Sequence, residues 1–222
     1  MQADRNWCVH SRYTLKQFGL PDTVRGSVLD IGCSAGGMSP CFTPDQYLGI
    51  DCMLHTVRTA QQTYPHHNFA HFDCVHPTYN PGGVLDHSDL SSVGRFDWIF
   101  LRSVYTHMTW ESAQAHLESV KKCLTPGGRV YYTLWSLADV IPVWQKMREA
   151  FGDSITPLRP EVALGPDQYL IDGGVSVSDP ESAELSVCSF FDVEQFAVCS
   201  GSEISHRQGE VAPRSQWVLM SK

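Results

Sequence analysis

The stretch Ser27–Gly37, SVLDIGCSAGG, decides how the rest of the sequence is interpreted. It opens with an apolar, β-branched run that predicts a buried strand over Ser27–Ile31, and it continues into a loop rich in glycine and small residues. Glycines at such a point let the backbone turn sharply and let a ligand approach closely. Because open parallel sheets bind ligands at the carboxyl ends of their strands, this loop marks the expected binding edge.

Downstream of the loop, short apolar runs alternate with helical patterns. Met53, Val57, Ala60 and Tyr64 share one helical face, and Thr109 is placed to cap a helix that ends near Leu124. A third helix is expected over about 138–151. The alternation predicts an α/β fold, doubly wound, with a mostly parallel sheet covered on both faces. Further strands are predicted at Gln46–Ile50, Asn68–Phe72, Phe96–Leu101 and Val130–Trp135.

The C-terminal third of the chain follows a different pattern. Phe190–Val198 and Gln216–Met220 are predicted as two strands with no helix between them, which favours an antiparallel pair. The stretch 152–189, rich in Gly, Pro and Ser, is too long for a plain connection and is predicted to be an insertion on the substrate side. We expect 1–222 to be a single domain in which the segment 1–25 lies near the active site.

Composition excludes several classes of function. A net charge of −8 over 222 residues disfavours a nucleic-acid surface, which needs clustered Lys and Arg. No apolar run is long enough to cross a bilayer and no signal-peptide core is seen, so a cytoplasmic protein is expected. The eight cysteines form no C-x-x-C pair and are interpreted as reduced thiols. The oligomeric state stays open.

Three predicted strands each end in an aspartate, and the charge limits which ligand fits. Asp30 lies two residues before Gly32, where a pyrophosphate would be repelled at a cost of roughly 1–4 kcal/mol at about 4 Å. A ligand with ammonium and sulfonium groups, such as S-adenosylmethionine, would be attracted instead. Asp51 is placed to accept hydrogen bonds from ribose hydroxyls, and Asp73 from an adenine amino group.

Several segments of the chain resemble class I S-adenosylmethionine-dependent methyltransferases, over roughly residues 25–136. The segments are VLDIGCSAGG at Val28–Gly37, YLGID at Tyr47–Asp51, FDWIFLRSVYTHM at Phe96–Met108 and LTPGGRVYYTLW at Leu124–Trp135. Within the family, the YNPG at Tyr79–Gly82 and the SVYTHM at Ser103–Met108 resemble a bacterial-type subgroup. The resemblance implies a seven-stranded sheet with an antiparallel last strand, and S-adenosylhomocysteine as product.

The resemblance also implies which residues hold the cofactor. Asp30, Gly32 and Gly36 would hold its methionine end, Asp51 its ribose, and Asp73 with Cys74 its adenine. Ser34 stands where the family often has glycine, and its hydroxyl is placed to add a hydrogen bond. The full set of predicted cofactor contacts is Asp30, Gly32, Cys33, Ser34, Gly36, Asp51, Cys52, Asp73, Cys74 and Ser103.

The loop after the fourth predicted strand would face the reacting methyl group. His107 is the candidate base, although a histidine there also serves to fix the loop. Arg102 is placed to bind a substrate carboxylate or phosphate, or alternatively the cofactor carboxylate, and Tyr105 offers a hydroxyl. Trp135 would wall the pocket or simply pack. His66, His67, His71, Cys74 and His76 crowd one segment without converging, so no metal site is predicted.

The preferred interpretation is an S-adenosylmethionine-dependent methyltransferase that transfers a methyl group to an O or N of a small molecule by in-line displacement. One alternative is a non-catalytic S-adenosylmethionine-binding module or regulatory subunit, which would bind the cofactor without turnover. A NAD-type oxidoreductase is a further alternative, against which Asp30 argues. The sequence names neither the acceptor nor its reacting atom.

Overall fold

The computed structural model describes residues 15, 18–76, 79–87, 89–136, 169–171, 188–191, 193–208 and 216–221. Within them the chain forms one nine-stranded sheet with three α-helices and two short 3-10 turns. The strands are β1 Val28–Ile31, β2 Tyr47–Asp51, β3 Asn68–His71, β4 Phe96–Leu101, β5 Leu124–Ser136, β6 Tyr169–Ile171, β7 Cys188–Phe191, β8 Glu203–Gln208 and β9 Gln216–Ser221. The helices are α2 Leu54–Thr63, α3 Trp110–Lys122 and α5 Val193–Ser200, and the turns are η1 Ser39–Cys41 and η2 Tyr105–His107.

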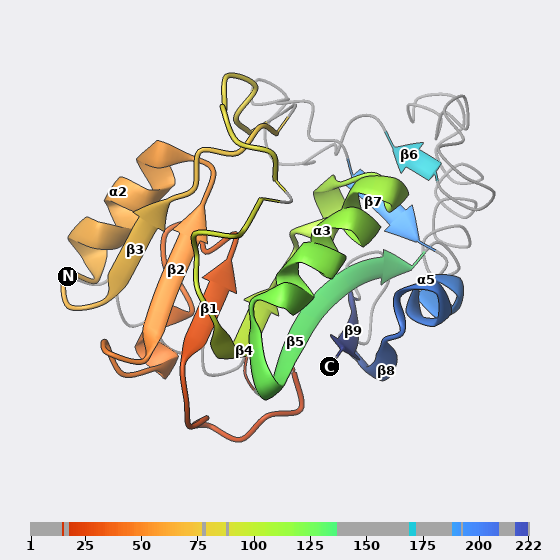
Figure 1. The fold of residues 1–222 in the computed structure, drawn as a ribbon, viewed down its shortest axis with the longest axis horizontal. Coiled ribbons are helices and arrows are strands. Elements are labelled where there is room, and N and C mark those ends of the chain that lie inside the picture. The colour runs from red at the N-terminus through yellow and green to blue at the C-terminus, as the bar shows by residue number, and fades with distance from the viewer. Residues whose placement is uncertain are drawn as a thin grey trace, which may run out of the picture.

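The sheet is mostly parallel, as the alternation of strands and helices predicts (Figure 1). Its main path runs β3-β2-β1-β4-β5-β7-β6, and the pairs from β3 through β5 are all parallel. β9 lies antiparallel along β5, and β8 pairs antiparallel with β9. The predicted class, a doubly wound sheet with an antiparallel last strand, is confirmed.

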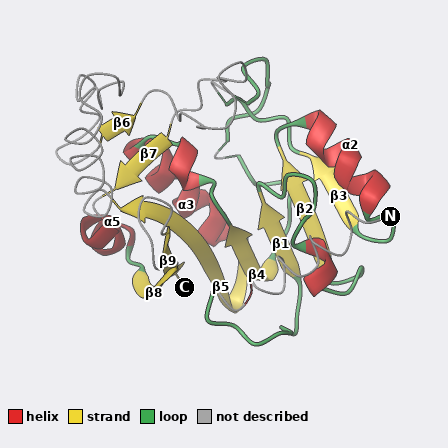
Figure 2. Ribbon diagram, turned by 180° about the vertical axis from the view of Figure 1, so that it is seen from behind, coloured by secondary structure: helices red, strands yellow, loops and turns green. Residues whose placement is uncertain are grey.

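Helices cover both faces of the sheet (Figure 2). On one face Leu29 of β1 belongs to the same core cluster as Leu117 of α3 and Phe196 of α5. On the other face Val28 belongs to a second cluster with Val57 of α2. Neighbouring residues of a strand point to opposite faces, so a strand apolar on both sides suits this three-layer arrangement. No helix in the described part is long and apolar enough to cross a membrane.

The C-terminal elements correct two predictions. Phe190–Val198, expected as a strand, divides into the short strand β7 and the helix α5. The buried positions of α5 are Val193, Phe196, Ala197 and Ser200, a helical spacing hidden in a short apolar run that fits either element. The predicted antiparallel pairing of Phe190–Val198 with Gln216–Met220 is also wrong, because β7 pairs with β5 and β6, whereas β9 pairs with β5 and with β8, which was not predicted. The helix expected over 138–151 lies outside the described residues, as do 1–14 and most of 152–189.

The loop after β1 turns through three residues with left-handed backbone, Gly32, Ser34 and Gly36. Gly32 has φ +73°, and a Cβ at this position would lie 2.6 Å from a methyl group of Val104. Ser34 has φ +49°, a conformation that side chains rarely adopt and that favours glycine. The Ser34 amide donates a 2.8 Å hydrogen bond to Asp51, which holds the strained residue in place.

Asp30 lies in a different environment from the one predicted. Its side chain is 2% exposed and accepts a 2.6 Å hydrogen bond from the Tyr47 hydroxyl. Burial raises the pKa of Asp30 to about 7, although the bond from Tyr47 and the charge of Arg102 act in the opposite direction. Asp30 is therefore enclosed within the core beneath the loop, and its position does not support the expected direct contact with a cationic ligand.

Replacing Gly32 with alanine should destabilise the fold through both strain and contact. We expect Gly32→Ala to lower the free energy of unfolding by about 2–4 kcal/mol, measured by urea denaturation. Gly127→Ala is the matched control, because Gly127 also has positive φ but its added Cβ would meet nothing within 4 Å. Val104→Ala should restore part of the loss in Gly32→Ala; equal losses in the two glycine variants would contradict the contact.

The raised pKa of Asp30 predicts a pH-dependent stability difference. Between about pH 4 and pH 7 the folded state keeps a proton that the unfolded state has lost, so the wild type loses stability as the pH rises. Asp30→Asn cannot ionise and should gain ~2–4 kcal/mol over the wild type across this range, measured by urea denaturation at each pH. Asp89→Asn should instead be slightly less stable than the wild type over the same pH range. Hydrogen bonds from Ser91 lower the pKa of Asp89, so they stabilise its charged form in the folded state.

Candidate functional site

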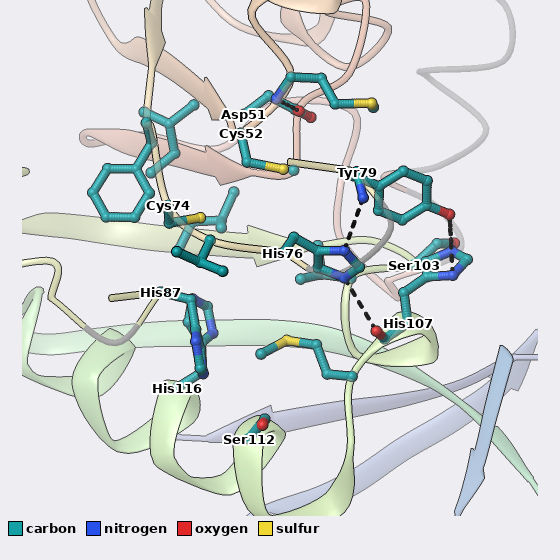
Figure 3. A pocket seen from close by; sticks show the side chains of 18 of the residues that line it. Asp51, Cys52, Cys74, His76, Tyr79, His87, Ser103, His107, Ser112 and His116 are labelled. Carbon is teal, nitrogen blue, oxygen red and sulfur yellow. Dashed lines mark hydrogen bonds between the residues drawn. The ribbon is translucent and has the colours of Figure 1, made fainter. Parts of the chain in front are cut away.

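A cavity of about 550 Å³ opens where β1, β2 and β4 end, at the predicted binding edge (Figure 3). It is walled by the loops after these strands, by the segment after β3 and by the start of α3. The structure therefore brings segments distant in sequence to one site. The residues predicted from sequence that line it are Gly32, Ser34, Asp51, Cys52, Cys74, Arg102, Ser103 and His107.

Asp51 is the central acidic group of the lining. One carboxylate oxygen accepts a 2.8 Å bond from the Ser34 amide, and the other accepts a 2.8 Å bond from the Met53 amide. The carboxylate thus fixes the loop after β1 against the start of α2. A carboxylate has about four lone-pair positions, so each oxygen keeps capacity for a ligand hydroxyl.

The loop after β4 is held in a strained conformation beside the cavity. Ser103 has φ +55°, and its amide donates a 2.9 Å bond to the Thr133 hydroxyl of β5. Thr106 donates a 2.9 Å bond back to the Ser103 carbonyl. These bonds stabilise a left-handed serine in the cavity lining, where such strain commonly accompanies function.

Arg102 provides positive charge in the cavity wall. Burial lowers the pKa of Arg102, whereas the nearby Asp30 carboxylate acts to raise it. The buried Asp30 therefore influences the cavity through Arg102, although Asp30 itself does not line it. A cation in this position suits a ligand carboxylate.

The wall between β2 and the segment after β3 carries two thiols and apolar groups. The thiols of Cys52 and Cys74 interact, and the hydrogen bond between them raises the pKa of Cys52 and lowers that of Cys74. Phe72 and Ile50 line the same cavity. Neutral sulfur and apolar surfaces of this kind suit a flat aromatic base.

Several predicted residues lie outside the lining. Tyr105 is fully buried, and its hydroxyl lies 3.3 Å from Nδ1 of His116, so its predicted catalytic role finds no support in its position. The Cys33 side chain is buried in the core. Gly36 lies so close to the Phe69 ring that a Cβ at this position would clash with it. Asp73 accepts a 2.9 Å bond from the Asn80 amide. The Trp135 ring lies 6.2 Å from that of His107, between centroids, without lining the cavity.

Sequence reasoning missed a group formed around His107. Its imidazole Nδ1 lies 3.2 Å from the Tyr79 hydroxyl, and its backbone carbonyl lies 3.2 Å from Nε2 of His76 (Figure 3). Both partners come from the segment after β3, far from the β4 loop in sequence. The YNPG and SVYTHM segments are well separated in the sequence, and only the fold shows that they are in contact.

A second pair of missed histidines closes the far end of the cavity. The rings of His87 and His116 lie nearly parallel, 5.9 Å apart. Burial lowers the pKa of His116 to about 3, so this ring is neutral at physiological pH. Ser112 and Thr109, at the start of α3, complete this end. Among the described residues, no three His, Cys, Asp or Glu side chains converge as metal ligands.

Solved structures show how common this fold is among methyltransferases. A SAM-dependent methyltransferase from Methanosarcina mazei matches with a TM-score of 0.57 at 19% identity, over 93% of this chain and 95% of that one. The N-methyltransferase NodS from Bradyrhizobium japonicum WM9 matches with a TM-score of 0.53 at 15% identity. The match covers 97% of this chain and 95% of NodS.

A third match is magnesium protoporphyrin IX methyltransferase from Synechocystis PCC 6803, which was solved with bound S-adenosylhomocysteine. Its TM-score is 0.56 at 14% identity, and the match covers 98% of this chain and 82% of that one. At these identities the likeness shows a shared fold. In the sequence, residues 29–130, from β1 into β5, match a family model described as a methyltransferase domain.

Proposed function

We propose that the protein binds S-adenosylmethionine in the cavity after β1, β2 and β4 and methylates an O or N of a small molecule. The observation that carries the proposal is the position of Asp51. Its carboxylate joins the loop after β1 to α2 and keeps lone pairs free for a ribose. In the Synechocystis neighbour the bound product is S-adenosylhomocysteine, which supports the same ligand here.

The cofactor would lie along the loop after β1. Its adenine fits the wall of Phe72, Cys52 and Cys74, and its carboxylate fits Arg102, which is the second of the roles predicted for that residue. The sulfonium supplies an activated methyl group, so the protein must align an acceptor and exclude water. A cavity walled by several loops meets both needs.

The acceptor would occupy the end of the cavity lined by histidines and hydroxyls. His107 would take the proton of an acceptor hydroxyl while the acceptor oxygen bonds to the methyl carbon and the bond from that carbon to the sulfonium sulfur breaks, which releases S-adenosylhomocysteine. An amine that is already neutral needs no such base. The size of the cavity suits a small molecule, which agrees with the acidic balance of the chain in disfavouring RNA.

Asp51→Asn should weaken S-adenosylmethionine binding, and because Asn has a single acceptor oxygen, one of the two backbone amides held by Asp51 also loses its partner. The change removes the charge that strengthens hydrogen bonds to ribose, and we expect at least a tenfold rise in Kd, equivalent to about 1.4 kcal/mol. Isothermal titration calorimetry provides the measurement. Asp89→Asn, at an exposed aspartate, is the control and should bind as the wild type does. No wild-type binding at millimolar cofactor would refute the proposal.

His107→Ala should separate binding from turnover. If His107 is the base, S-adenosylhomocysteine release with hydroxyl acceptors should fall about 10²–10⁴-fold, while cofactor affinity stays within about twofold. Release is measured by chromatography against one set of phenols and one set of amines. His66→Ala, an exposed histidine, is the control. Equal turnover in His107→Ala and the wild type would leave His107 only its loop-fixing role.

A further inference from the structure

His76 joins the two segments that meet at the acceptor end of the cavity. Its Nε2 lies 3.2 Å from the His107 carbonyl oxygen, and its Nδ1 lies 3.2 Å from the Tyr79 amide. A carbonyl only accepts and an amide N–H only donates, so both bonds form in one state of the ring alone. That state is the neutral imidazole with its proton on Nε2.

Burial favours the same neutral state. The His76 side chain lines the cavity, and desolvation lowers its pKa. The charged or titratable groups that act on it are His107, His87 and Asp51. The Tyr79 ring also packs against it, with centroids 4.8 Å apart. The ring is thus held from both sides as a fixed link between two stretches of backbone.

The link determines where the Tyr79 hydroxyl lies. The Tyr79 and His107 rings are nearly perpendicular, with centroids 5.2 Å apart. The hydroxyl lies 3.2 Å from Nδ1 and 3.5 Å from Nε2 of His107. Because His76 bonds to the backbone of both residues, it fixes the distance between this hydroxyl and this imidazole (Figure 3).

We propose that Tyr79 and His76 are positioning residues for His107: Tyr79 hydrogen bonds to its imidazole, and His76 holds the two segments in register. The inference rests on the proposed function, in which His107 is the base. A phenol hydroxyl donates to a neutral imidazole and accepts from a protonated one. Hydrogen bonds to a charged partner are about twice as strong, so Tyr79 stabilises the protonated ring and makes His107 a stronger base.

The test follows the ring nitrogens of His107 by NMR in ¹⁵N-labelled full-length protein, titrated from pH 5 to 9. Tyr79→Phe removes only the hydroxyl and should lower the midpoint of the His107 titration by about 0.5 pH unit or more, a roughly threefold change in protonation. His76→Ala should lower it similarly. His76→Gln, which keeps one donor and one acceptor, should retain most of the wild-type value.

Tyr64→Phe is the matched control, since Tyr64 lies at the end of α2 beside His67 and outside the cavity lining. An unchanged His107 midpoint in Tyr79→Phe would overturn the role of the hydroxyl. Equal shifts in His76→Ala and His76→Gln, or a wild-type His76 protonated on Nδ1, would overturn the link. Calorimetry with S-adenosylmethionine on the same samples tests the proposed function independently, because absent binding leaves the titration interpretable.

Discussion

The two hydrogen bonds accepted by Asp51 are the interaction on which the binding edge depends. They connect the amide of Ser34, in the loop after β1, with that of Met53, before α2. Two loops from neighbouring strands are thereby held in one geometry, including the left-handed backbone at Ser34. Without a carboxylate at the end of β2, both amides would lose their partners and the strained loop would lose its main restraint.

The cavity combines this edge with an opposite side assembled from separate segments. The β4 loop supplies Arg102, Ser103 and His107, and the chain after β3 supplies His76 and Tyr79. Charge is distributed unevenly between the layers: the Asp30 carboxyl lies in the core, and the Arg102 guanidinium lies at the cavity wall. The charge at the cavity wall is thus influenced by a buried group that does not line the cavity.

Much of the fold was predictable, because the strands of the parallel sheet are short apolar runs separated by helical patterns. The strand ends Asp30 and Asp51 were located correctly, but sequence carries no information on whether a side chain points into a cleft or into the core. Asp30 and Tyr105 were therefore expected at the surface of the site, whereas both side chains are buried. His76 and Tyr79 were missed as partners of His107 because contacts across a sheet edge have no sequence periodicity. The apolar run containing Phe196 fits strand and helix equally, and only packing decides.

The pairing of β9 with β5 has a consequence for the kinetics of folding. β1, β2 and β3 assemble from nearby parts of the chain, whereas β4 pairs with β1 across 70 residues, as Val28↔Trp98 shows, and six residue pairs join β5 to a strand farther still along the sequence. Val218 and Leu219 of β9 enter the two different core clusters, so neither layer is complete before this strand arrives. High contact order of this kind slows the search for the native state. Until β9 docks, the flank of β5 is an unprotected edge prone to association with other chains.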